Sequence, residues 1–168
     1  MISGKCIKFG DSINTDVIMP GRYLVSIDPK ELAEHAFEPL GAEVQARLKA
    51  SAIVVAGINF GCGSAREQAA SGLVGRGIQA IIARSFARTF FRNCINTGLL
   101  GVECPDAVAA ITDGGEASID PAEGIVRVGD EVFRFAPYPE NLRRILDAGG
   151  LIPYLAKYVL GVEGQRHG

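Results

Sequence analysis

Short apolar runs recur along the first two thirds of the chain, and most are followed by a segment with helical spacing. The runs have the length and composition of buried strands, and they predict strands at 2–9, 52–56, 78–83 and 99–103. Helices are predicted between them at 28–37, 42–49, 64–74 and 86–96. The order strand, helix, strand, helix, strand indicates a parallel sheet portion with helical crossovers.

The pattern changes after residue 115, where short segments alternate between apolar and polar positions. Segments 116–120, 125–128 and 131–135 are separated by turn-forming residues, which predicts antiparallel strands or hairpins. Two further helices are expected at 139–146 and 151–160. We therefore expect an α/β fold with a mixed sheet, and a length of 168 residues suits one domain over 1–168.

The composition narrows the class of protein. Hydrophobic residues make up 48% and charged residues 21%, which is typical of a globular chain. A net charge of −2 gives no broad basic field for nucleic acid. The first residues lack the apolar core of a signal peptide, and no run approaches the ~18 apolar residues of a membrane helix. We expect a soluble cytoplasmic protein without nucleic-acid or membrane partners.

The four cysteines do not form a ligand pattern. Cys6, Cys62, Cys94 and Cys104 are irregularly spaced and include no C-x-x-C pair. Free thiols are the usual state of such cysteines in the cytoplasm. They are a poor ligand set for zinc or an iron–sulfur cluster, so no metal site is expected on this chain.

A glycine-punctuated loop at 57–63 joins a predicted strand to a predicted helix. Ser64 and Glu67 have the spacing of a capping box, and Arg66 would stand in the first turn. Backbone N–H groups and the helix dipole favour an anion there, and a guanidinium binds carboxylate in a planar fork. An equally open interpretation is that Ser64 only caps the helix, Glu67 returns that bond and Arg66 pairs with a surface acid.

A second polar segment runs from Asp11 to Asp16. Asp16 could orient a catalytic group, or it could only build an Asx-turn. His35 falls on a predicted amphipathic helix and His167 in a polar tail, so neither is expected to be catalytic. A Ser–His–Asp hydrolase is not favoured, since G-x-S-x-G is also missing.

Three ordered segments resemble the signature segments of aconitase-superfamily swivel domains: GDSINTDVIMPGRYL, GINFGCGSAREQAA and ARSFARTFFRNCINTGLLGVECP. From about residue 4 to 160 the chain is similar to the family of stand-alone small subunits of 3-isopropylmalate dehydratase and homoaconitase. The resemblance implies a compact β/β/α swivel domain. It also implies a larger partner subunit that carries a 4Fe–4S cluster, with the active site between the two chains.

The resemblance further implies a hydro-lyase that isomerises a small 2-hydroxy dicarboxylate by dehydration and rehydration. Ser64 would be the catalytic base, Arg66 would bind a substrate carboxylate, and Asp16 would belong to the hydrogen-bond network. Gly63 and Ala65 would line the same substrate-binding place. Many relatives have a second serine where this chain has Ala65, so one substrate hydrogen bond would be absent.

The resemblance also assigns substrate choice to Tyr23, Leu24 and Val25. Homoaconitase-like members carry an arginine where Val25 stands, and valine suits an apolar group such as isopropyl. The favoured substrate is therefore isopropylmalate, in leucine biosynthesis; Val25 could instead be a core residue. Citramalate, dimethylmalate or homoaconitate chemistry, a non-catalytic anion-binding module and a purely structural subunit stay open. The oligomeric state of the isolated chain stays open as well.

Overall fold

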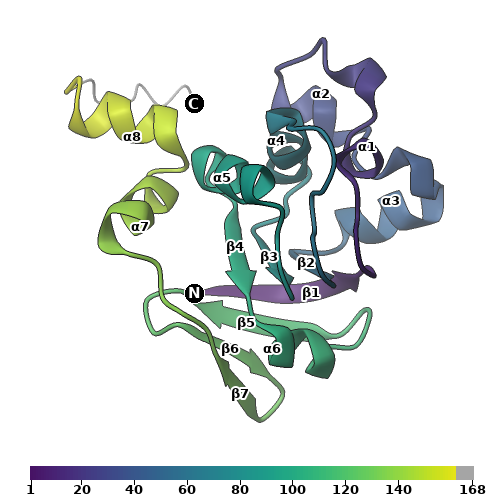
Figure 1. Ribbon diagram of the computed structural model, residues 1–168, viewed down its shortest axis with the longest axis vertical. Helices are drawn as coiled ribbons and strands as arrows, with labels where there is room; N and C mark the ends of the chain where they lie inside the picture. The colour runs from purple at the N-terminus through teal and green to yellow at the C-terminus, as the bar shows by residue number, and fades with distance from the viewer. Residues whose placement is uncertain (162–168) are drawn as a thin grey trace.

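The structure is a computed structural model that describes residues 1–161. Its strands form one seven-stranded mixed sheet in the order β4-β3-β2-β1-β5-β6-β7 (Figure 1). The strands are β1 (Ile2–Lys8), β2 (Ile53–Ala56), β3 (Ala80–Ala83), β4 (Leu100–Glu103), β5 (Glu116–Asp120), β6 (Ile125–Val128) and β7 (Glu131–Arg134). The predicted α/β class with a mixed sheet is confirmed. His167 lies outside the described residues.

Strand β1 belongs to both halves of the sheet. Its second half pairs in parallel with β2, with Cys6 opposite Ile53, and β2, β3 and β4 continue in parallel. Its first half pairs antiparallel with β5, with Ile2 opposite Ile119, and β5, β6 and β7 continue antiparallel. The change from parallel to antiparallel pairing therefore occurs at β1, in the middle of the sheet.

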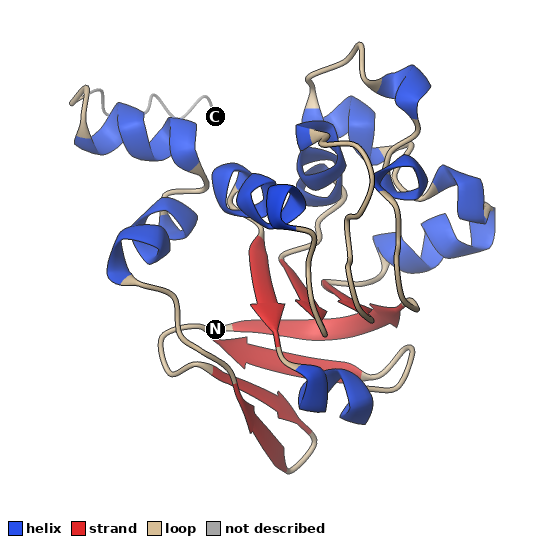
Figure 2. Ribbon diagram, in the orientation of Figure 1, coloured by secondary structure: helices blue, strands red, loops and turns tan. Residues whose placement is uncertain are grey.

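The helices are mostly short, and those that precede residue 100 gather over one face of the parallel half (Figure 2). Helix α2 packs on α4, α4 packs on α5, and α5 packs on α7 and α8. The α-helices are α1 (Thr15–Ile18), α2 (Pro29–Ala33), α3 (Ala42–Lys49), α4 (Glu67–Gly75), α5 (Arg88–Thr97), α6 (Pro105–Ala110), α7 (Glu140–Asp147) and α8 (Leu151–Tyr158). Two 3₁₀ helices, η1 (Gly21–Tyr23) and η2 (Glu38–Leu40), lie among them.

The parallel strands are buried on both faces, which explains their continuous apolar runs. Alternate residues such as Val54 and Ile81 pack under the helices, in a cluster with Leu73 and Phe90. Their neighbours face a second cluster, to which β5, β6 and α6 contribute residues that include Ile119. The antiparallel half thus covers the second face of the parallel half. This layering is the expected β/β/α arrangement.

Two helix predictions were wrong at their ends. Helix α4 begins at Glu67 with Arg66 at its N-cap, and within residues 1–161 it has no side-chain cap. The expected capping box is therefore absent, because Arg66 has an extended backbone and Ser64 lies outside the helix. The helix expected at 28–37 does start with an Asp28 cap, but it ends at Ala33. Helices α1 and α6 were not predicted at all.

The last strand of the parallel half is covered by the chain that leads to α7. The Tyr138 hydroxyl donates a hydrogen bond to the Gly101 carbonyl on β4, and burial raises the pKa of Tyr138.

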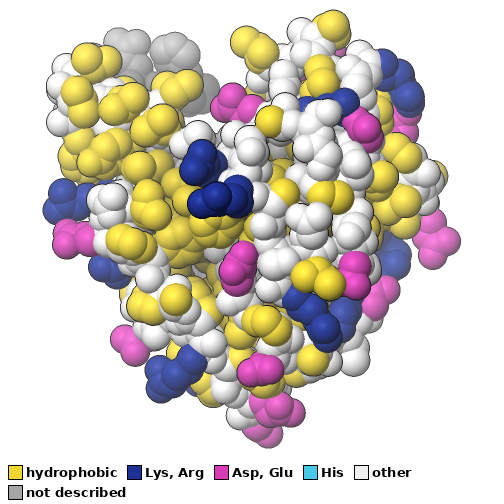
Figure 3. Space-filling model, in the orientation of Figure 1, with side chains coloured by type: hydrophobic (Ala, Val, Ile, Leu, Met, Phe, Trp, Pro, Cys, Tyr) yellow, Lys and Arg dark blue, Asp and Glu magenta, His cyan; other side chains and the backbone are white. Residues whose placement is uncertain are grey.

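Apolar side chains are exposed on α8 and directly after it, and Figure 3 shows apolar side chains gathered on this side of the molecule. The exposed residues include Ile152, Tyr158 and Leu160. Grouped exposed apolar side chains are typical of surfaces that contact another molecule.

Candidate active site

Three loops meet at the carboxyl edge of the parallel strands. They follow β1, β2 and β3, and this edge is where open α/β sheets place their ligand sites. The loop after β2 lies between the other two: Asn14 forms a bridge with Cys62, and Phe60 forms one with Phe86. The residues predicted from the sequence to be catalytic or substrate-binding lie in two segments: Asp16 and Tyr23 to Val25 lie between β1 and α2, and Gly63 to Arg66 lie between β2 and α4.

The first two loops are joined by backbone hydrogen bonds. Gly61 N donates to Ile13 O at 2.8 Å, and Thr15 N donates to Cys62 O at 2.8 Å. Gly63 has φ +92°, and a Cβ there would lie 2.6 Å from the Asn14 amide nitrogen. Only glycine fits this approach and this backbone conformation. Gly61 and Gly63, which the sequence predicted to form an anion-binding loop, therefore also allow the loops after β1 and β2 to contact each other.

Thr15 is a buried polar residue that the sequence reasoning did not single out. It is 1% exposed, and its hydroxyl donates to the Ser64 carbonyl at 2.8 Å. Asn14, the residue before it, caps α1 by accepting from Asp16 N at 2.8 Å. In the sequence, the position of Thr15 directly after an asparagine that can cap a helix was the available indication of this role. Thr15, the first residue of α1, thus holds the backbone of Ser64 in place.

Ser64 is exposed at the surface of this edge, together with Gly63 and Ala65. Because α4 begins only at Glu67, the Ser64 hydroxyl is free of the capping role that was one of its two interpretations. The same shift removes Ser64 from the first turn, where the helix dipole acts most strongly.

Arg66 is less exposed than residues 63–65 before it, and only 16% of its side chain is accessible to solvent. The side chain reaches back to α1. Its guanidinium forms an ion pair with the Asp16 carboxylate and donates to the Met19 carbonyl at 3.2 Å. Gly21 lies beside the same guanidinium. Asp16 is 60% exposed, so one side of the pair is open to solvent. The structure therefore brings Asp16, Ser64 and Arg66 to one place.

The segment from 20 to 28, called here the 20–28 loop, continues from this place. Val25 is 93% exposed, so the alternative that Val25 is a core residue was wrong. Tyr23 is partly buried, and its hydroxyl donates to the Glu38 carboxylate at 2.7 Å. The Leu24 carbonyl accepts from Gln68 Nε2 at 3.3 Å. The loop thus presents an apolar side chain while its backbone is tied to α4.

The cysteines give no ligand set among the described residues. All four are free thiols, and Cys6, Cys94 and Cys104 are buried. Burial raises the pKa of the Cys6 thiol to about 11 and that of Cys94 further still. Within residues 1–161, three or more metal-binding side chains nowhere gather closely enough to hold an ion. An iron–sulfur cluster does not fit the cysteines of this chain, since a cluster needs several accessible thiolates together.

A partly open cavity of about 360 Å³ adjoins the 20–28 loop. It lies between the loop, α4, α5 and the start of α8, and its lining includes Ile27, Val74 and Ile152. None of the predicted catalytic residues lines it. The Ser64 region is instead an exposed edge.

In the part of the chain that is described, no helix is long and apolar enough to cross a membrane.

The fold and this edge define a class of protein. Residues 13–107 match the model of the aconitase C-terminal domain, and they include the loops after β2 and β3 and the end of the loop after β1. The match covers more than half of the chain. The chain belongs to the aconitase C-terminal domain family.

Within that family the chain is similar to proteins named as small subunits. The chain is 48% identical to the 3-isopropylmalate dehydratase small subunit of Caldanaerobacter subterraneus, over 94% of this chain and 99% of the relative. It is 42% identical to the 2,3-dimethylmalate dehydratase small subunit of Eubacterium barkeri, over 90% and 94%. The crystal structure of 3-isopropylmalate dehydratase from Methanocaldococcus jannaschii superposes with a TM-score of 0.86, at 40% identity and 95% coverage of both chains.

Proposed function

We propose that this chain is the small subunit of a hydro-lyase that interconverts 2-isopropylmalate and 3-isopropylmalate in leucine biosynthesis. The observation that carries the proposal is the meeting of Ser64, Arg66 and Asp16 at one exposed edge. A carboxylate-binding cation beside a hydroxyl suits a reaction that removes a proton next to a carboxylate. The names of the relatives support the same reaction.

Each of these side chains has a distinct role in the proposed reaction. Arg66 binds a substrate carboxylate in a planar fork and stabilises the negative charge that develops on it. Asp16 holds the guanidinium in place, as it does in the free chain. Ser64, as the alkoxide, accepts the proton from the carbon next to the one that bears the hydroxyl. The electron pair of that C–H bond forms the double bond, and the C–O bond breaks to release hydroxide. Ser64 returns that proton when water adds at the other carbon.

A serine hydroxyl is a weak acid, so Ser64 needs a site that excludes water and offers N–H donors. Gly63 and Ala65 flank it and contribute the nearest backbone groups. Because the edge is open in this chain, the enclosure is assigned to a larger partner subunit. A 4Fe–4S cluster on that partner would supply Lewis-acid activation of the substrate hydroxyl. The substrate then lies between the two chains.

The substituent of the substrate is assigned to the 20–28 loop. Val25 is exposed and uncharged, and it favours an isopropyl group over a further carboxylate. Leu24 lies beside it, and Tyr23 shapes the same loop. Sequence identity alone separates the substrates poorly, because the dimethylmalate relative is almost as similar as several isopropylmalate relatives. Dimethylmalate is therefore the second candidate substrate, and its methyl groups suit the same apolar loop.

We also propose that the chain forms one domain over residues 1–168 and works in the cytoplasm. The continuous sheet and the two cores that share its strands support a single domain. The four free cysteines suit a reducing compartment.

The proposal is tested with the chain reconstituted with a cluster-bearing large subunit and assayed on isopropylmalate, dimethylmalate, citramalate and homoaconitate. Ser64→Ala should lower kcat by about 10²–10⁴-fold, the usual contribution of a proton-transfer group. Ser71→Ala, on helix α4, is the matched control and should keep kcat. Rapid turnover of another acid without turnover of 2-isopropylmalate would reject the substrate assignment.

A second variant tests the carboxylate site. Arg66→Lys keeps the charge but loses the bidentate fork, so we expect a large rise in KM for 2-isopropylmalate. Arg127→Lys makes the same change on β6 in the antiparallel half and should behave as the wild type. If Ser64→Ala and Arg66→Lys both retain full activity, the chain is a structural subunit without catalytic side chains.

A further inference from the structure

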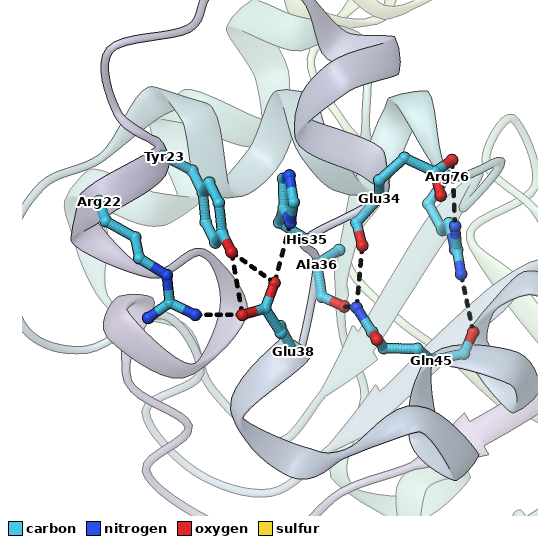
Figure 4. Close-up of polar contacts among 8 residues, drawn as sticks. All are labelled: Arg22, Tyr23, Glu34, His35, Ala36, Glu38, Gln45 and Arg76. Atoms are coloured by element: carbon cyan, nitrogen blue, oxygen red, sulfur yellow. Dashed lines mark hydrogen bonds and ion pairs between the residues drawn. The ribbon is translucent and has the colours of Figure 1, made fainter.

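The carboxylate of Glu38 is surrounded by three side chains, two from the start of the 20–28 loop and one from the turn between α2 and η2 (Figure 4). The Tyr23 hydroxyl lies 2.7 Å from Glu38 Oε2 and 3.0 Å from Oε1. His35 Nδ1 lies 2.8 Å from Oε2, and Arg22 forms an ion pair with Oε1. The Tyr23 and His35 rings stack with centroids 3.5 Å apart. One carboxylate therefore binds two consecutive residues of the loop.

The backbone before Glu38 explains how this carboxylate is aimed. Phe37 has φ +56° and ψ 21°, a left-handed conformation that costs a non-glycine residue about 1–2 kcal/mol. The conformation is retained because Phe37 is fully buried and stacks on Phe9 with centroids 4.4 Å apart. Its N–H also donates to Ile18 O at 3.0 Å. The position of Glu38 is thus fixed by the core and does not depend on the loop.

The loop is tied down again beyond Tyr23. Gln68 Nε2 donates to the Leu24 carbonyl at 3.3 Å, and the Ser26 hydroxyl donates to Glu31 at 2.6 Å. Between these attachments the Val25 side chain is 93% exposed. The backbone of the loop is therefore held at several points while its apolar side chain projects outward.

We infer that Glu38 is a positioning residue that holds the 20–28 loop in the conformation in which Leu24 and Val25 meet the substituent of the substrate. The inference rests on the proposed function, which assigns the substituent to this loop. Glu38 acts through Tyr23 and Arg22 and does not touch the substrate. Without it the loop samples other conformations, and only the competent fraction binds. KM then rises, while kcat is retained because the bound complex has the same loop conformation.

The test compares Glu38→Ala with Glu34→Ala. Glu34 is four positions earlier and also forms an ion pair, with Arg76 at 3.6 Å, but it makes no polar contact with the loop among the described residues. In the isolated chain, amide hydrogen exchange over residues 21–27 should become faster in Glu38→Ala and stay unchanged in Glu34→Ala. In the reconstituted complex, KM should rise about tenfold if the competent fraction falls to ~0.1, with kcat within about twofold. Glu34→Ala should keep both constants.

A double-mutant cycle separates positioning from a general loss of packing. If Tyr23 and Glu38 act as one unit, Tyr23→Phe/Glu38→Ala should raise KM no further than Glu38→Ala alone. Unchanged exchange in Glu38→Ala, or a fall in kcat at constant KM, would overturn the inference. If the wild-type complex prefers another acid, only the substrate assignment fails, and KM is compared on that acid. A complex inactive on every acid overturns the proposed function and, with it, the role of Glu38 in selectivity.

Discussion

Gly63→Ala tests whether the loops after β1 and β2 are held together as closely as the structure indicates. Gly63 has φ +92°, and Gly77, in the turn after α4, has φ +95°. The conformational cost of a Cβ is therefore nearly the same at both positions, about 1–2 kcal/mol. The surroundings differ: a Cβ at Gly63 would lie 2.6 Å from Asn14 Nδ2, whereas a Cβ at Gly77 would have no described atom within 4 Å apart from its chain neighbours.

The expected magnitudes follow from this difference. Overpacking adds about 1–3 kcal/mol to the destabilisation by Gly63→Ala, on top of the cost that it shares with Gly77→Ala. Both variants should remain folded, since a typical domain has ~5–15 kcal/mol of stability. Activity should separate them more sharply, because Gly63 precedes Ser64 and a displacement of about 1 Å can lower turnover by ~100-fold. Gly77→Ala should turn over like the wild type.

The free energy of unfolding is measured by urea titration of the isolated chain, and turnover is measured in the reconstituted complex. A third variant, Gly63→Ala with Asn14→Ser, replaces the amide that the new methyl group would meet by a residue that still caps α1. This double variant should regain most of the free energy of unfolding that overpacking removes from Gly63→Ala. Equal destabilisation by Gly63→Ala and Gly77→Ala, with turnover retained in both, would refute the close approach of the two loops.

Two further predictions concern the Ser64 backbone and acid stability. Thr15→Val removes the donor to the Ser64 carbonyl and should lower the free energy of unfolding, measured by urea titration, by about 1–3 kcal/mol. Thr15→Ser keeps the donor and should lower it less. Equal losses in the two variants would contradict the role of that bond. Asp113 has a pKa below the usual 3.8, chiefly because Arg47 donates to it. Its contribution to stability is therefore full above pH 3.8 and is lost as pH falls through the lowered pKa, so the advantage of the wild type over Asp113→Asn should disappear in acid thermal scans. An advantage that persists at the lowest pH would contradict this assignment.

The sheet was predictable because its strands carry the signal that burial requires. Segments 52–56 and 78–83 are continuous apolar runs, and the structure buries both faces of β2 and β3. The alternation after residue 115 likewise predicted β5 and β6. The four-residue helix α1 gave no periodic pattern, because it is shorter than two helical turns and is defined mainly by the Asn14 cap.

The site was predictable in its residue types and less so in its geometry. The motif indicated Ser64 and Arg66, but the S-x-x-E spacing misplaced the start of α4. Spacing describes one segment, whereas Arg66, which has an extended backbone, pairs with Asp16 on α1, far away in the sequence. The contact of Tyr23 with Glu38 was missed for the same reason, since it depends on the left-handed turn at Phe37.

The bond from Tyr138 to Gly101 has a consequence for the isolated chain. Strand β4 is the outermost strand of the parallel half, and an outermost strand can recruit a strand from another copy and start aggregation. The segment that carries Tyr138 occupies one carbonyl of this strand. At the opposite end, β7 carries charged residues at both termini, Glu131 and Arg134, which disfavour the same pairing. The bond on β4 and the charges on β7 therefore both disfavour the pairing of a further strand at the ends of the sheet.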